Sequence, residues 1–323
     1  MKFRTEIEIE SWHRQIEYKE SIVSLGSCFA DNIARKLAER KFSITASPTG
    51  ILFNPASIAS TLNKLRNGYR VSSEELILRD GRYLNYDFHS SFSASTAEEA
   101  IAVMQNAMER GAEAMKRADH IIITLGTAWV YRHKESGKVV ANCHKQPQAL
   151  FDRQMLTVKE IVDSLAPEIE HLAPQKQVVL TLSPVRHIGD GLVDNSLSKA
   201  TLRVAIEELC RRYSGVIYFP AYEIVMDDLR DYRFYADDLT HPSTSAIEYI
   251  AERFFDVALS TDTKQRMMSI ERIVRAAQHR PMNPHSEEYR AFCRKQLDEI
   301  AKFEDIDFEE EKRHFDAMLQ INL

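Results

Sequence analysis

The stretch that decides the fold is Ser21-Ile22-Val23-Ser24-Leu25-Gly26-Ser27-Cys28-Phe29-Ala30-Asp31-Asn32. A short apolar run ends at Gly26, and apolar residues then recur at Phe29, Ile33 and Leu37 with the spacing of a helix face. The pattern predicts a strand, a tight turn and a helix, with Ser27 at the carboxyl end of the strand. Backbone N–H groups and the helix dipole favour negative charge at such a place. Ser27 therefore fits a nucleophile whose oxyanion needs those donors, although from this stretch alone a serine that only caps the helix is the preferred interpretation.

Outward from this stretch, strands and helices alternate along the chain. Continuous apolar runs at residues 120–125 and 177–182 are typical of strands buried on both faces of a parallel sheet. Five central strands are expected to start near residues 22, 42, 120, 177 and 216. This order predicts a doubly wound α/β fold, in which ligands bind beyond the carboxyl ends of the strands.

The remaining segments are predicted to surround that sheet. Residues 1–20 are polar and alternating, which indicates an extended lead-in that pairs at a sheet edge. Residues 66–95 are dense in aromatic and polar side chains and are expected to form a small hairpin or loop over the fold. Helical patterns at 264–279, 286–301 and 308–319 carry apolar stripes that need a surface to cover them. We therefore expect an α/β domain over residues 1–262 and a helical extension over 263–323 that packs on the same domain.

Composition excludes several classes of protein. The net charge of -6 leaves no broad basic surface for nucleic acid, so no nucleic-acid partner is expected. The four cysteines, Cys28, Cys143, Cys210 and Cys293, are scattered and indicate neither a zinc site nor a disulfide framework. The chain shows no apolar leader and no stretch long enough to span a bilayer, so a soluble cytoplasmic protein without a membrane partner is expected. Its oligomeric state stays open.

A second polar motif follows the fifth predicted strand. Asp238 and His241 lie on a predicted loop with two residues between them. That spacing allows the carboxylate to accept a hydrogen bond from the imidazole and fix its tautomer, which leaves the other ring nitrogen free to take a proton from a serine. The alternative is an aspartate that binds local backbone beside an incidental histidine.

Together, the Gly-Ser at the first strand and the Asp-x-x-His after the last one resemble the layout of the SGNH, or GDSL-like, hydrolases. The segment Gly26-Ser27-Cys28-Phe29-Ala30 is the motif that names the GSCFA family, a bacterial branch that resembles those hydrolases. Further blocks similar to that family lie at residues 51–55, 87–90, 125–129, 142–145 and 183–187. The resemblance covers roughly residues 20–260, and the helical tail more loosely.

The resemblance implies a three-layer α/β/α hydrolase fold in which Ser27 is the nucleophile, His241 the base and Asp238 its orienter. In the wider superfamily the oxyanion hole uses the serine's own N–H, a glycine after the second strand and an asparagine after the third. Gly50 matches the glycine. The block that usually supplies the asparagine reads Gly126-Thr127-Ala128-Trp129 here, so this donor does not carry over. The candidate substitutes are Asn54, Asn142 and the Thr127 hydroxyl.

Other residues near the predicted strand ends have a functional and a structural interpretation. Cys28 lies where a helix start lowers a thiol pKa, but a packed cysteine is the preferred interpretation. Trp129 and Tyr131 fit stacking on a sugar ring or core packing, and Arg186 fits an anion contact or a structural ion pair. A second group, spaced too irregularly for a zinc site, is expected to contact substrate or bond structurally: Asp87, His89, Cys143, His144 and His187. No metal or cofactor is expected.

The sequence thus predicts a serine esterase that hydrolyses a small or carbohydrate-linked O-acyl ester through an acyl-enzyme. Two alternatives remain. One is an O-acyltransferase with the same triad, in which a sugar hydroxyl replaces water. The other is a non-catalytic carbohydrate-binding protein on a degenerate hydrolase scaffold, which the missing asparagine favours and the intact Ser, Asp and His oppose.

Overall fold

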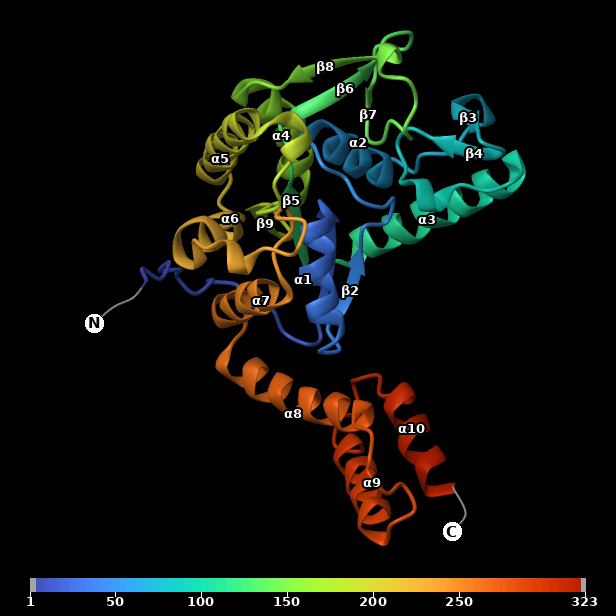
Figure 1. The fold of residues 1–323 in the computed structure, drawn as a ribbon, viewed down its shortest axis with the longest axis vertical. Helices are drawn as coiled ribbons and strands as arrows, with labels where there is room; N and C mark the ends of the chain where they lie inside the picture. Colours follow the sequence, from blue (N-terminus) through green and yellow to red (C-terminus); the bar gives the residue numbers. More distant parts are fainter. Residues whose placement is uncertain (1–3, 321–323) are drawn as a thin grey trace.

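The computed structural model describes residues 4–320 and is built around one five-stranded parallel sheet (Figure 1). Its strands lie in the order β10-β9-β5-β1-β2, and every neighbouring pair is parallel. Their bounds are β1 Ser21–Gly26, β2 Ser43–Ala46, β5 His120–Leu125, β9 Gln177–Leu182 and β10 Val216–Phe219. The predicted α/β fold with five central strands is therefore confirmed.

Helices cover both faces of the sheet, which gives three layers (Figure 1). One face carries α1 (Cys28–Ala38) and α7 (Thr244–Ala258); the other carries α2 (Pro55–Arg66), α3 (Ala97–Arg117), α4 (Val158–Leu172) and α5 (Leu192–Arg212). Side chains along a strand alternate between these layers, so Ile122 packs with α1 and α7 while its neighbours Ile121 and Ile123 pack with the other set. Both apolar cores are sealed from water, as the continuous apolar runs predicted.

Two small antiparallel sheets lie outside the central one. The hairpin predicted within residues 66–95 is present as β3 (Leu76–Arg79) and β4 (Arg82–Asn85). A three-stranded sheet, with β6 (Trp129–His133) between β7 (Val139–Val140) and β8 (Phe151–Met155), separates β5 from α4 and was not predicted. Short helical segments complete the chain: Ser73–Glu75, Ser90–Phe92, Gln148–Leu150, Ile188–Asp190, α6 (Ala221–Glu223), Ile224–Leu229 and Tyr232–Phe234.

The lead-in, as far as residues 4–20 describe it, does not pair with a sheet edge, so that prediction is wrong for these residues. It runs instead along the end of α7, where Trp12 and Ile16 donate backbone hydrogen bonds to the carbonyls of Val257 and Ala258. Ile16 also forms an isolated bridge with Leu259. The last carbonyls of a helix have no partner within the helix, and the lead-in satisfies two of them.

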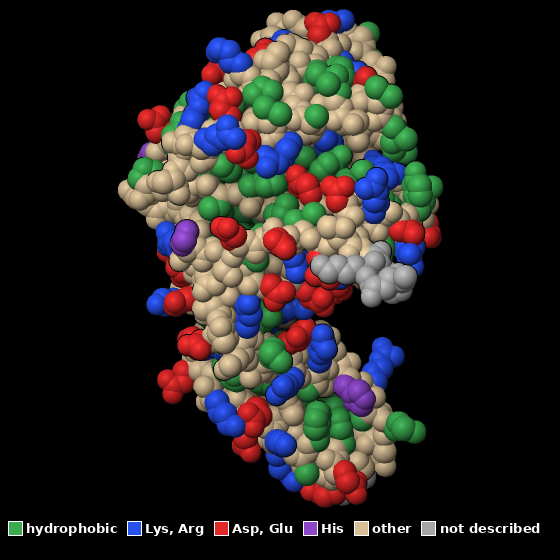
Figure 2. Space-filling model, turned by 90° about the vertical axis from the view of Figure 1, so that its left-hand side faces the viewer, with side chains coloured by type: hydrophobic (Ala, Val, Ile, Leu, Met, Phe, Trp, Pro, Cys, Tyr) green, Lys and Arg blue, Asp and Glu red, His purple; other side chains and the backbone are tan. Residues whose placement is uncertain are grey.

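The three C-terminal helices form a smaller lobe beside the α/β layers. They are α8 (Thr261–Gln278), α9 (Glu287–Ile300) and α10 (Glu309–Gln320). Figure 2 shows this lobe below the main body, with an indentation between the two on that face. Ion pairs join it to the end of α1: Arg40 with Glu271 at 3.0 Å and Lys41 with Glu311 at 2.8 Å. The lobe's apolar residues belong to the same buried cluster as α1 and α7. Within residues 4–320, no helix has both the length and the apolar character needed to cross a bilayer.

Truncation after Asp262 is expected to remove the protein from the soluble fraction. The change would uncover apolar side chains of α1 and α7, and would leave the buried Arg40 guanidinium without its carboxylate. The measurement is the soluble yield and the thermal unfolding of the truncated and full chains. A truncated chain that stays folded, monomeric and as stable as the full chain would contradict the expectation.

Candidate active site

The turn between β1 and α1 is held against β5 by a glycine. Gly26 has φ +138°, and a Cβ there would lie 2.2 Å from the carbonyl oxygen of Thr124, so only glycine fits. The next residue, Ser27, donates its backbone N–H to that same oxygen at 3.2 Å. The Ser27 hydroxyl is fully buried, has no hydrogen-bond partner among the described residues and does not cap α1. Ser27 thus faces the interior of the protein.

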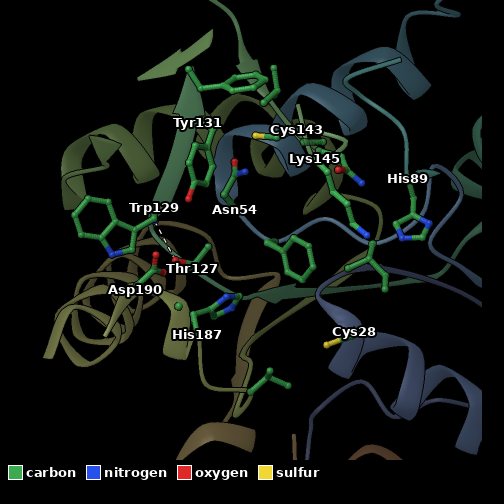
Figure 3. Close-up of a pocket in the computed structure, with 18 of the residues that line it drawn as sticks. Cys28, Asn54, His89, Thr127, Trp129, Tyr131, Cys143, Lys145, His187 and Asp190 are labelled. Atoms are coloured by element: carbon green, nitrogen blue, oxygen red, sulfur yellow. Dashed lines mark hydrogen bonds between the residues drawn. The ribbon is translucent and has the colours of Figure 1, made fainter. Parts of the chain in front are cut away.

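Cys28, the first residue of α1, faces the other way and lines a cavity (Figure 3). Burial raises the pKa of its thiol, and the Asp31 carboxylate adds to that rise. The backbone N–H groups of Cys28 and Phe29 and the ammonium of Lys199 act in the opposite direction. Because the net shift is upward, Cys28 is a protonated thiol at neutral pH, and a base must remove its proton before it attacks a substrate.

The cavity has a volume of about 780 Å³ and lies at the carboxyl edge of the sheet. Residues that follow β1, β2, β5, β9 and β10 all contribute to it, together with the β6–β8 sheet. Polar or ionisable side chains that line it include those of Cys28, Asn54, His89, Thr127, Asn142, Lys145, Arg186, His187, Asp190 and His241. The size suits a small-molecule ligand, and the location is the one that the parallel sheet predicted.

Asp238 and His241 form the hydrogen-bonded pair that their spacing predicted. The carboxylate Oδ2 lies 2.6 Å from the imidazole Nδ1, and Oδ1 accepts the backbone N–H groups of Thr240 and His241 at 2.8 and 2.9 Å. These bonds, led by that from the His241 N–H, lower the pKa of Asp238 to about 2. With Nδ1–H donated to Asp238, Nε2 of His241 is left able to accept a proton.

The predicted hydrogen bond between Ser27 and His241 is not formed, because the Ser27 hydroxyl has no hydrogen-bond partner among the described residues. The predicted oxyanion donors are also engaged elsewhere. The N–H of Ser27 is bonded to Thr124, and that of Gly50 donates to Ser47 at 2.8 Å. The N–H groups of Gly126 and Thr127 both donate to the Phe53 carbonyl, at 2.8 and 2.9 Å. These four amides all have backbone acceptors, so the oxyanion donors stay a prediction that rests on other groups at the cavity.

Among the donors left at the cavity, two lie at the starts of α1 and α2. The N–H of Cys28, at the start of α1, has no backbone acceptor in the described structure. Asn54 caps α2 with its Oδ1, which accepts the Ser57 N–H at 2.8 Å, and its Nδ2 is left without an acceptor among the described residues. The Thr127 hydroxyl is instead bonded to the Ser198 hydroxyl at 3.1 Å. Of the three candidate substitutes, Asn54 is therefore better placed than Thr127.

The other predicted residues divide between the cavity and the framework. His89 and Asn142 line the cavity, and Asn142 Oδ1 accepts the His144 N–H at 2.8 Å. His144 is buried and forms hydrogen bonds with Asn85 and Ser90, so of its two expected roles it has the structural one. Trp129 and Tyr131 line the cavity wall, and the Arg153 guanidinium lies 3.5 Å from the Trp129 ring centre. No cluster of residues able to hold a metal ion is present in the described part of the chain.

Family comparison agrees with the motif in the β1–α1 turn. The GSCFA family model matches residues 21–254, and the model of the GSCFA domain protein, C-terminal domain, matches residues 270–321. The chain belongs to the GSCFA family. No curated protein matches the sequence. Two solved structures are similar over most of their lengths, at low identity.

The first is a candidate platelet activating factor from Streptococcus pneumonia, with 12% identity, a TM-score of 0.37, and 73% of this chain and 83% of that chain covered. The second is a carbohydrate esterase family 3 protein from Talaromyces cellulolyticus, with 9% identity, a TM-score of 0.36, and 77% and 98% covered. Likenesses of this strength do not support an argument about the reaction of this GSCFA protein.

One buried charged residue near the GSCFA motif was not predicted from the sequence. Lys199 lies in α5, is fully buried, and donates from Nζ to the carbonyls of Gly126 and Ser183, both at 2.7 Å. Burial lowers the pKa of Lys199 to about 7, and it also lowers that of His187 to about 4, where the Lys199 charge adds to the effect. The only signal in the sequence was a lysine on the apolar face of a helix, three residues before Leu202.

Lys199→Met is expected to change how the stability of this GSCFA protein depends on pH. Between about pH 7 and 10.5 the unfolded chain binds a proton at Lys199 that the folded chain does not, so this group makes stability rise with pH. The slope approaches about 1.4 kcal/mol per pH unit at most. Urea unfolding of both proteins at pH 6 to 9 measures it, with the exposed Lys138→Met as control. If the difference in free energy of unfolding between the wild type and Lys199→Met is the same at every pH, the expectation is contradicted.

Proposed function

We propose that this GSCFA protein hydrolyses a small or carbohydrate-linked O-acyl ester through a covalent acyl-enzyme formed at the β1–α1 turn. The observation that carries the proposal is the Asp238–His241 pair at 2.6 Å, whose imidazole opens on a cavity that also receives a nucleophilic side chain. An oriented base, a nucleophile and unengaged N–H donors in one cavity are what acyl transfer requires.

The geometry favours Cys28 over Ser27 as that nucleophile. Cys28 lines the cavity, whereas the Ser27 hydroxyl is buried without a partner. A nucleophile's own N–H commonly contributes to its oxyanion hole. The Cys28 N–H has no backbone acceptor among the described residues, whereas the Ser27 N–H is bonded to the Thr124 carbonyl. The serine nucleophile implied by the family resemblance stays a prediction, and the experiments below separate the two residues.

The proposed reaction has two steps. In the first, Nε2 of His241 takes the thiol proton, the Cys28 sulfur bonds to the ester carbonyl carbon, and the negative oxygen is stabilised by the Cys28 N–H and Asn54 Nδ2. The carbon–oxygen bond then breaks, and His241 returns the proton to the leaving alcohol, which leaves a thioester on Cys28. In the second, His241 deprotonates a water that attacks the thioester; an acid is released and the thiol is restored.

Asp238 keeps its role throughout this cycle. Because its pKa is about 2, it remains a carboxylate at any pH where the protein works, and it stabilises the imidazolium that forms in each step. His187, whose pKa is lowered to about 4, is neutral under the same conditions and does not compete for the proton.

The test is to trap the acyl group. Wild-type protein is incubated with 4-nitrophenyl acetate, quenched in acid, digested and sequenced by mass spectrometry. We expect one acetyl group on Cys28, removed by neutral hydroxylamine, which cleaves thioesters but leaves oxygen esters at Ser27 in place. An acetyl group on Ser27 would restore the serine mechanism. Turnover without any acyl-enzyme, or no turnover of this or any other acyl ester, would overturn the proposal.

A further inference from the structure

The cavity carries more positive charge than its residues neutralise, although the whole protein is acidic with a net charge of -6. Its charged lining residues other than histidines are Lys145, Arg186 and Asp190. Asp190 is neutralised by an ion pair with Arg153 at 2.7 Å. The two cations have no carboxylate partner among the described residues, so the cavity retains an uncompensated positive charge.

Lys145 extends into the cavity from a well-anchored turn, between Cys143 and His89 in Figure 3. His144 and Lys145 both have positive φ, at 49° and 54°, a left-handed conformation that is unfavourable for a non-glycine residue. The turn persists because the buried His144 ring bonds to the Asn85 carbonyl at 2.8 Å and to the Ser90 hydroxyl at 2.9 Å. The backbone of the turn is thus anchored, whereas the ammonium of Lys145 makes no ion pair or hydrogen bond with any described residue.

Arg186 supplies the second charge, from the segment that follows β9. Its guanidinium lies against two aromatic faces, 4.0 Å from the ring centre of Tyr235 and 5.1 Å from that of Tyr232. These rings fix the group in place without cancelling its charge. The Arg186 backbone N–H donates to Thr240 at 3.1 Å, next to the His241 that we propose as the base.

From these observations we propose that the ester taken by this cavity carries an anionic group, a carboxylate or a phosphate, which the Lys145 ammonium binds while Arg186 supports the positive potential. This inference rests on the proposed function and names its substrate class. A single charge-assisted hydrogen bond contributes enough to binding that its loss is measurable as a change of about tenfold in affinity.

The test compares ester pairs that differ in charge. Two probes carry the anionic group on the alcohol part, 4-carboxyphenyl acetate and 4-acetoxyphenyl phosphate, and are compared with the neutral ester methyl 4-acetoxybenzoate. One probe carries it on the acyl part, methyl hydrogen adipate, and is compared with the neutral ester dimethyl adipate. We expect Lys145→Met to raise KM about tenfold for an anionic probe, to change it less than twofold for the neutral one, and to spare kcat. Lys145→Arg should retain most of the preference, and added salt should reduce it.

The matched control is Lys138→Met, which removes an exposed lysine that lies outside the cavity on the same small sheet, beside β7. Equal KM effects of Lys145→Met on anionic and neutral probes in both pairs would overturn the charge proposal and leave the hydrolase intact. If no ester is turned over, the hydrolase proposal fails instead. In that case, calorimetry measures the binding of 4-carboxyphenyl acetate and of 4-acetoxyphenyl phosphate to the wild type and to Lys145→Met. The charge proposal requires that Lys145→Met weakens the binding of at least one of them, and unchanged binding of both would overturn it.

Discussion

Cys28→Ala is expected to reduce ester turnover by at least about a thousandfold while the protein stays folded. Removing the nucleophile of a covalent mechanism leaves only the catalysis that binding and oxyanion donors supply. The fold should tolerate the change because Cys28 is half-buried at the cavity wall and its side chain makes no ion pair or disulfide with a described residue. The measurement is kcat/KM for 4-nitrophenyl acetate, with circular dichroism and thermal unfolding to verify the fold.

Ser27→Ala is the matched control, one residue away. It removes a buried hydroxyl that has no partner, so the expected effects are turnover within about threefold of wild type and unchanged or slightly increased stability. Cys28→Ser also tests which residue is the nucleophile, since it replaces the thiol at position 28 by a hydroxyl in the same place in the cavity. A folded, inactive Ser27→Ala beside an active Cys28→Ala would assign the nucleophile to Ser27.

Asp238→Asn is expected to lower kcat by about a hundredfold to ten-thousandfold. The carboxylate accepts Nδ1–H of His241, whereas an amide in its place can donate to Nδ1 and so favours the tautomer that carries its proton on Nε2. His241 would then be unable to take the thiol proton. Because Asp238 titrates near pH 2 in the wild type, its protonation should not shape the activity profile above about pH 3.

The neighbouring Asp237→Asn provides the control for charge alone. Asp237 is exposed and makes no ion pair or hydrogen bond with a described residue, so its loss should leave kcat within twofold of wild type. Steady-state kinetics from pH 4 to 9 on both variants measures the contrast. Equal losses for the two would show that negative charge on this loop, and not the geometry of the imidazole, matters for the reaction.

The features that sequence predicted well depend on short-range order. The inner strands β5 and β9 are nearly continuous apolar runs, and Asp238 and His241 lie only three residues apart, so both features can be recognised in short stretches of the sequence. The β6–β8 sheet was missed because its strands are short and partly exposed, as in the pattern Phe-Asp-Arg-Gln-Met of β8. Such a pattern lacks the apolar density that identifies a buried strand.

The oxyanion donors and the nucleophile were harder to predict, for two different physical reasons. The amides of Ser27 and Gly126 are engaged by the carbonyls of Thr124 and Phe53, which lie far from them in sequence. Sequence therefore cannot show that these donors are already used. The choice between Ser27 and Cys28 depends on where α1 begins, since one residue along a helix turns a side chain by about 100°.

Helix α1 connects the cavity at the sheet edge with the C-terminal lobe. Its first residue is Cys28, and directly after its last turn come Arg40 and Lys41, which bind α8 and α10 of the C-terminal lobe. Eleven helical residues span about 16 Å and are stiff along their axis. The helix thus has the Cys28 thiol at one end and the lobe at the other. Because α1 also packs on β1 and β2, the position of Cys28 in the cavity depends on both the lobe and the sheet.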